Sequence, residues 1–230
     1  MRTLRTLAPY GVAVLILGAM SCSAGGTASS PAALPMQQHW AAGNALQHAM
    51  VRGDLTAARR AAASIAEVEE LPGLSWDAET YLARMRAEAL LVQSARTFQA
   101  AAVSTGRMAA ACGACHARGG VGPHPGSSLS EPTVSEDDDD YHMIRHGWAM
   151  DRMWEGLVVP SEDRWEAGVH VLGDHPLSAV GVSPEVALMA ARVHEMARQA
   201  MADETPEARA DRFGRILMDC AGCHAELGIQ

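Results

Sequence analysis

Two cysteine–histidine motifs are the part of this sequence with the most specific chemistry. In each motif two thiols are three residues apart and a histidine follows at once, so the thiols can add to the two vinyl groups of a haem. The adjacent imidazole can then ligate the iron from the same turn of chain through its Nε2 atom. We therefore predict two covalently attached c-type haems, with His116 and His224 as the proximal iron ligands. The attaching thiols are Cys112 and Cys115 in the first motif, and Cys220 and Cys223 in the second.

Two other chemistries use paired cysteines. A dithiol oxidoreductase would place its C-x-x-C in a βαβ setting, and the sequence shows no strand pattern. Structural zinc would require further cysteine or histidine ligands at a regular spacing near each motif, and none is obvious. Haem attachment is therefore the favoured interpretation.

Charge and composition restrict the partners. The chain has 230 residues, of which 48% are hydrophobic and only 4% aromatic, and it is rich in alanine, a strong helix former. It has 18 basic residues, all of them arginine, and 27 acidic residues, which gives a net charge of −9. This balance argues against nucleic acid as a partner. The acidic surface fits an electropositive redox partner, or solubility alone.

The N-terminus has the pattern of an export signal over residues 1–21. Arg2 and Arg5 precede an apolar stretch from Leu7 to Met20 that is too short for a confident membrane span. The fifth cysteine, Cys22, follows directly, and this position suggests a lipidated N-terminus in the periplasm or envelope of a bacterium. Cleavage that leaves a free thiol is the alternative, because Ala19 and Met20 match a lipobox poorly. Residues 22–33 would then form a flexible tether.

The chain reads as a tandem repeat. An offset of 108 residues superposes the two haem motifs and aligns Gly106 with Gly214. Upstream the offset becomes 103 and aligns His39 with His142, because residues 157–161 are an insertion in the second half. We predict an all-α protein with two tandem four-helix-bundle-like haem units, over residues 34–118 and 139–230.

Capping and breaking residues divide each unit into four helices. The predicted helices span residues 35–52, 55–70, 76–94 and 97–118 in the first unit, and 139–156, 161–173, 184–202 and 206–226 in the second. The predicted N-caps are Asp54, Ser75, Thr97, Ser161, Ser183 and Thr205. Residues 119–138, rich in glycine and proline and then acidic, are predicted to be a flexible linker.

A haem motif in the last helix of a four-helix unit resembles the cytochrome c′ and cytochrome b562-like bundle family. The resemblance covers the architecture of about residues 34–230 and not the detailed sequence. It implies that the first helix of each unit faces the haem and either supplies the sixth iron ligand or leaves the iron five-coordinate.

The repeat selects among the possible distal ligands. His39 and His142 are a matched pair and are the preferred candidates, while His146 lies one turn after His142 and could replace it. Met50 and Met153 are a second matched pair, although methionine at such spacing is usually core packing. Two further matched residues, Arg107 and Arg215, precede the motifs and could pair with haem propionates, or be ordinary surface arginines.

Two functions follow from two haems. With filled sixth positions, the protein would be an electron carrier between a redox donor and acceptor in the cell envelope. With an open iron, it would be a c′-like protein that reduces peroxide or binds diatomic gases. No distal acid–base pair is evident in the sequence, so we expect a carrier and not an enzyme.

Overall fold

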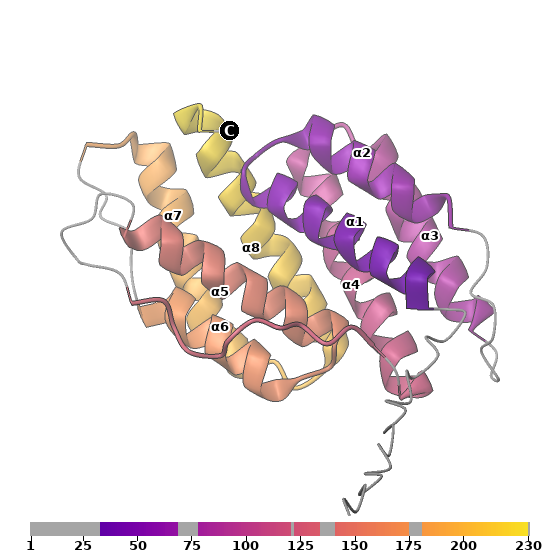
Figure 1. Cartoon of the computed structure of the whole chain (residues 1–230). Helices are drawn as coiled ribbons and strands as arrows, with labels where there is room; N and C mark the ends of the chain where they lie inside the picture. The colour runs from indigo at the N-terminus through magenta and orange to yellow at the C-terminus, as the bar shows by residue number, and fades with distance from the viewer. Residues whose placement is uncertain (1–32, 69–77, 121, 134–140, 175–180, 230) are drawn as a thin grey trace, which may run out of the picture.

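The computed structural model describes residues 33–68, 78–120, 122–133, 141–174 and 181–229. Every regular element in these ranges is a helix, which confirms the all-α prediction. The first half contains α1 (Ala33–Val51), α2 (Leu55–Ala66), α3 (Glu79–Ser94) and α4 (Phe98–Gly119). The second half contains α5 (Tyr141–Val158), α6 (Glu162–Asp174), α7 (Pro184–Ala200) and α8 (Pro206–Leu227). Figure 1 shows the two sets side by side.

Side-chain caps explain why the helices begin where the sequence predicted. Asp54 accepts a hydrogen bond from the Ala57 amide at 2.8 Å, and Thr97 accepts one from Ala100 at 3.2 Å. Ser183 and Thr205 cap α7 and α8 in the same way. Each cap satisfies an amide that has no partner within its own helix. The proposed cap Ser75 lies outside the described residues, and α3 is described from Glu79.

The two haem-motif helices pack against each other at matched glycines. A Cβ added to Gly106 would lie 2.3 Å from the Ala210 carbonyl oxygen, and one added to Gly214 would lie 3.0 Å from that of Ala102. These contacts pair earlier residues of α4 with later residues of α8, so the helices cross in antiparallel directions. The two motifs therefore lie at opposite ends of the crossing, as the ends of α4 and α8 in Figure 1 show.

The halves share one hydrophobic core and are not independent units. Buried residues of both halves form a single cluster that includes Leu46, Met108, Trp154 and Phe213. Across the interface, the Trp154 indole nitrogen donates to the Asn44 side chain at 2.9 Å. The rings of Trp154 and Phe213 have centroids 6.1 Å apart, within the range of aromatic contact.

Helix α5 ends later than the sequence predicted. The prediction ended it at Gly156 by analogy with Gly53, which closes α1 with a φ of +71°. Gly156 instead remains helical and α5 continues to Val158. The insertion after Gly156 supplies these extra residues, so α5 extends beyond the point at which its counterpart α1 stops.

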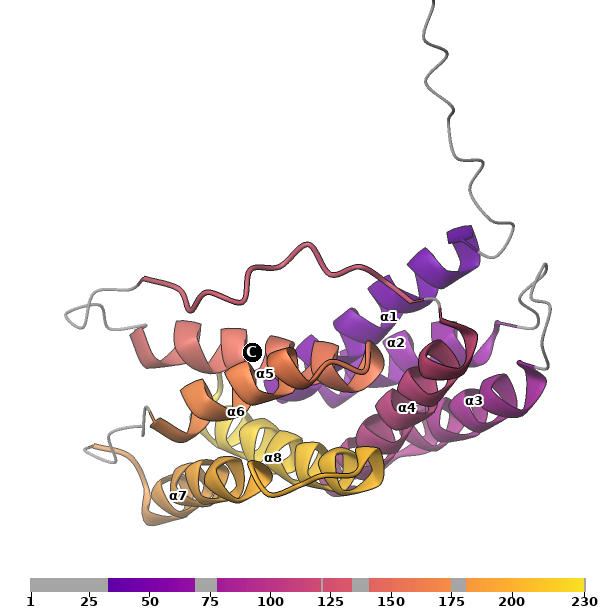
Figure 2. The ribbon, with the colours of Figure 1, turned by 90° about the horizontal axis from the view of Figure 1, so that it is seen from below.

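Part of the predicted flexible linker is held against the second half. Both carboxylate oxygens of Glu155 accept from the Ser127 hydroxyl, at 2.8 and 2.9 Å. Arg152 and Arg164 form ion pairs with the same carboxylate at 2.7 and 2.5 Å. Arg152 also donates to the Ser128 carbonyl oxygen at 2.9 Å. We call residues 122–133 the strap, and Figure 2 shows it running along α5. These polar groups connect a segment that the sequence predicted to be a flexible linker to α5 and α6.

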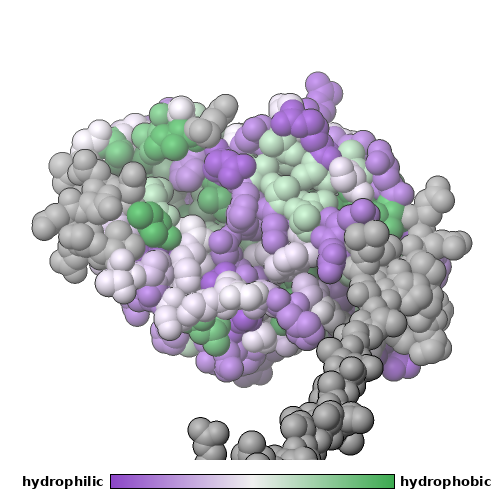
Figure 3. Space-filling view, in the orientation of Figure 1, coloured by the Kyte–Doolittle hydropathy of each residue, from purple (hydrophilic) through white to green (hydrophobic). Residues whose placement is uncertain are grey.

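The surface in Figure 3 is mixed, with hydrophilic side chains spread over the face that Figure 1 presents. A weakly apolar area at the upper right lies over the alanine-rich helices α1 and α2. In the part of the chain that the structure describes, no helix combines the length and the apolar character that crossing a membrane requires.

Candidate haem-attachment sites

A cavity lies beside the first C-x-x-C-H motif. About 570 Å³ of space lies between the lining atoms, and part of this space is open to solvent. Its lining comes from α1 to α5 and from Pro123 of the strap. Most lining side chains are apolar, and the motif residues Cys112, Cys115 and His116 all reach the cavity.

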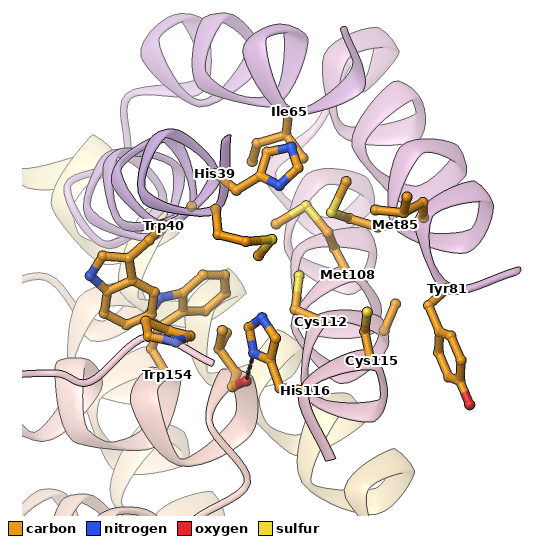
Figure 4. Close-up of a pocket in the computed structure, with 16 residues that line it drawn as sticks. His39, Trp40, Ile65, Tyr81, Met85, Met108, Cys112, Cys115, His116 and Trp154 are labelled. Carbon is orange, nitrogen blue, oxygen red and sulfur yellow. Dashed lines mark hydrogen bonds between the residues drawn. The ribbon is translucent and has the colours of Figure 1, made fainter. Parts of the chain in front are cut away.

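The distal candidate of the first half faces this cavity. His39 lines it from α1, and Figure 4 shows His39 and His116 on opposite sides with the two cysteines along α4. His39 is only 8% exposed, and neither of its ring nitrogens has a hydrogen-bond partner among the described residues. Burying unpaired polar atoms is costly, so such a ring calls for a ligand. An iron held between the two imidazoles would provide it.

Electrostatics keep these histidines in the form that ligates a metal. Burial lowers the pKa of His39, and the charges of Arg86 and His116 lower it further. Burial also lowers the pKa of His116, although its hydrogen bond to Val158 opposes the shift. Both rings are therefore neutral at neutral pH, and a neutral imidazole has the lone pair that an iron requires.

The proximal histidine is oriented by a carbonyl from the other half. The Nδ1 atom of His116 lies 2.6 Å from the carbonyl oxygen of Val158, the last residue of α5. A carbonyl only accepts, so Nδ1 carries the proton and Nε2 keeps its lone pair for a metal. The last carbonyls of a helix have no partner within the helix, and this one is used by His116. Histidines that ligate metals commonly donate their second nitrogen in this way.

The motif cysteines do not have the electrostatic properties of a reactive dithiol. Burial, followed by the charge of Cys115, raises the pKa of Cys112 to about 12. Burial likewise raises the pKa of Cys220 to about 12, and the charges of Cys223 and Asp219 add to the effect. Reactive dithiols instead have a depressed pKa. Among the described residues, no group of three or more His, Cys, Asp or Glu side chains is placed to hold a metal ion.

The second motif has different surroundings. His142 is half-buried, and its Nδ1 atom has no hydrogen-bond partner within the described chain. The ring of His146 instead packs against that of His194, with centroids 5.1 Å apart. His194, which comes from α7, donates from Nδ1 to the Leu172 carbonyl oxygen at 2.7 Å. Burial, with a smaller contribution from the charge of His142, lowers the pKa of His194, so the three histidines lie near one another.

His224, the proximal candidate of the second motif, has no carbonyl partner among the described residues, whereas its counterpart His116 has one. Burial lowers the pKa of His224, and its Nδ1 atom is buried with no partner in the described ranges. The turn after α1 packs close to this end of α8, because a Cβ on Gly53 would lie 2.7 Å from the Ala221 carbonyl oxygen. It places no acceptor at His224.

The remaining candidates lie away from the first cavity or outside the described residues. Met50 and Met153 are fully buried in the shared core, where methionine serves as packing. Arg107 and Arg215 are exposed, and the described lining of the cavity does not include Arg107, so the structure lends the propionate assignment no support. Cys22 and the export signal lie outside the described residues.

Sequence reasoning missed the contributions that cross between the halves. Trp154 and Val158 of α5 line the first cavity, although they belong to the second repeat. His194 was given no role because it has no histidine counterpart. The insertion at residues 157–161 was the signal that could have pointed to Val158, because it is the segment in which the two repeats differ in length.

Comparison with known proteins gives no relative. The chain matches no family model, and neither a curated protein nor a solved structure shows significant similarity to it. The assignment of the site therefore rests on the residues and geometry described above.

Proposed function

We propose that this protein is an exported di-haem c-type cytochrome that carries electrons between redox partners of the bacterial cell envelope. The observation that carries the proposal is the first cavity. It brings a C-x-x-C-H motif and a buried histidine with two unpartnered nitrogens to the same apolar space. These residues fit a covalently attached haem with a histidine on each side.

The residues have separate roles. Cys112 and Cys115 would hold the haem covalently, His116 would be the proximal ligand and His39 the distal one. In the second half, Cys220 and Cys223 would hold the haem and His224 would be proximal. His142 would be its distal ligand, with His146 as the alternative. When bound, a c-type haem supplies a one-electron ferric/ferrous couple, and the protein tunes it through the ligands and burial.

Two buried histidines that line one cavity favour a carrier over an enzyme. A filled sixth position excludes peroxide and diatomic gases, and apolar surroundings limit access of water. The proposed lipid on Cys22 would keep the carrier at a membrane, next to its donor and acceptor. This part of the proposal rests on the sequence alone.

An optical spectrum of the purified full-length protein tests the proposal. We expect two haems per chain by pyridine haemochrome and a sharp reduced α-band that carbon monoxide does not change. A broad high-spin spectrum that shifts with carbon monoxide would instead support the gas-binding or peroxide-reducing alternative. Protein without covalent haem, produced in a host that has the attachment machinery, would refute both functions.

A further inference from the structure

The geometry points to two unequal haem sites, in which the C-terminal carbonyl of α5 makes His116 a stronger electron donor than His224. The site at Cys112 and Cys115 then has the lower reduction potential, and an electron delivered to the protein settles at the second site. This inference rests on the proposed function, because it concerns how strongly each histidine donates to an iron.

The first step of the argument is the hydrogen bond. His116 Nδ1 donates to the Val158 carbonyl oxygen at 2.6 Å, a short distance for this kind of bond. The acceptor stands at the negative end of the α5 dipole, which strengthens it. Withdrawal of the Nδ1 proton toward an acceptor increases the basicity of the ring, and a more basic ligand favours the ferric state.

The second step is the difference between the halves. His224 is the repeat counterpart of His116, yet its buried Nδ1 atom has no acceptor among the described residues. Helix α1 stops at Val51 before Gly53 turns the chain, whereas α5 continues to Val158. The extra length of α5 therefore gives His116 a carbonyl partner that His224 does not have among the described residues.

The third step is the close packing around the contact between His116 and the end of α5. A Cβ added to Gly113 would lie 2.2 Å from the Leu157 carbonyl oxygen and 3.4 Å from Cγ of Pro160. From the other side, a Cβ on Gly122 of the strap would lie 3.3 Å from Cγ of the His116 ring. The ring and the end of α5 are thus held together by close packing as well as by the hydrogen bond.

Gly113→Ala is the variant that separates α4 from the end of α5. Haem attachment should tolerate the change, because the second motif already has Ala221 at the corresponding position. Gly147→Ala is a matched control on α5, since a Cβ there would meet nothing within 4 Å. Potentiometric titration of the haem-loaded proteins, followed optically, gives the two midpoint potentials.

Two single-haem proteins assign these potentials. Cys220→Ala with Cys223→Ala leaves the first haem, and Cys112→Ala with Cys115→Ala leaves the second. We expect the first haem to have the lower potential in the parent protein. In Gly113→Ala, the preference of the first haem for the ferric state should weaken about tenfold. Its midpoint reduction potential should therefore rise by about 59 mV, the value for a one-electron couple. The second haem and the Gly147→Ala protein should not change.

The outcomes separate this inference from the proposed function. Equal potentials, the reverse order, or no shift in Gly113→Ala would overturn the inference while two haems per chain leave the proposed function standing. If the protein carries no covalent haem, both fail. If Gly113→Ala does not fold, the order of potentials in the two single-haem proteins decides.

Discussion

The two halves of this protein have closely corresponding helices but different surroundings for their haem motifs. In the first half, His39 and His116 face one cavity, and the ring of His116 is fixed by the Val158 carbonyl oxygen. In the second half, His224 has no such acceptor in the described chain, and His146 and His194 pack beside the distal candidate. The two halves therefore share the C-x-x-C-H motif but differ in the residues packed around it.

The two motifs differ in their surroundings because residues from outside the first repeat help to enclose the first motif. Trp154, Val158 and the strap all come from outside the first repeat, yet they enclose its motif. The first site is therefore built by α1 to α5 and the strap, and so by both halves of the chain. The variants below test how far the two sites differ.

Loss of the attaching thiols should have the largest effect. Replacing Cys112 and Cys115 with alanine should reduce the covalent haem content from two to one per chain, and so should the same change at Cys220 and Cys223. We expect the first pair to lower Tm more, because the described cavity beside it would then be empty of its haem. Pyridine haemochrome assay, intact mass and thermal unfolding measure these effects. Equal losses of Tm would remove one distinction between the sites.

Removal of the distal histidines should affect the two haems differently. His39→Ala should convert the first haem from low-spin to high-spin and open it to carbon monoxide. His142→Ala should have a smaller effect, because His146 lies one turn away on α5 and can replace it. His48→Ala is a matched control, since this exposed residue of α1 bonds to Asp151 and not to the cavity. Electron paramagnetic resonance and carbon monoxide difference spectra give the spin states. An unchanged spectrum in His39→Ala would contradict the distal assignment.

Release of the strap should destabilise the protein and expose the first proximal histidine. Glu155→Gln would leave Arg152 and Arg164 without the carboxylate that pairs with both, and removal of one partner from a buried ion pair costs about 3–5 kcal/mol. Hydrogen exchange in residues 122–133 should increase. Urea unfolding and exchange mass spectrometry measure both effects. Glu195→Gln, in an exposed pair with Arg198, is the control and should leave Tm unchanged. A strap that stays protected would contradict the role given to Glu155.

The matched glycines at the helix crossing should show the smallest asymmetry. Gly106→Ala places a Cβ 2.3 Å from a carbonyl oxygen, so we expect a loss of about 1–3 kcal/mol in the free energy of unfolding. Gly214→Ala would place its Cβ 3.0 Å from a carbonyl oxygen, which is a milder overlap. Both variants gain about 1 kcal/mol in helix propensity, so the loss in Gly214→Ala should be the smaller one. Urea denaturation ranks the two variants, and the opposite ranking would show that the crossing differs from the one described.

Local signals in the sequence were sufficient for most of the fold. Caps such as Asp54, Thr97 and Thr205 act within one turn, so they predicted helix starts that the structure confirms. The end of α5 was predicted wrongly, because Gly53 and Gly156 are counterparts in the repeat but only one of them has a positive φ. The two C-x-x-C-H motifs could also be recognised from the sequence, because each consists of five consecutive residues in about one turn of helix.

Some features were decided only when the chain folded on itself. The sequence alone was enough to find the motifs, most of the helices and the correspondence of His39 with His142. These features depend on neighbours in the chain or on the internal repeat. Only the tertiary structure brings the Val158 carbonyl oxygen to His116, which lies 42 residues earlier in the chain. It also places Glu155 where its carboxylate bonds to Ser127 of the strap. Both contacts join segments that are distant in the sequence, and so does the crossing of α4 and α8 at Gly106 and Gly214. Packing of this kind has no local sequence signature, so the inequality of the two sites became visible only in three dimensions.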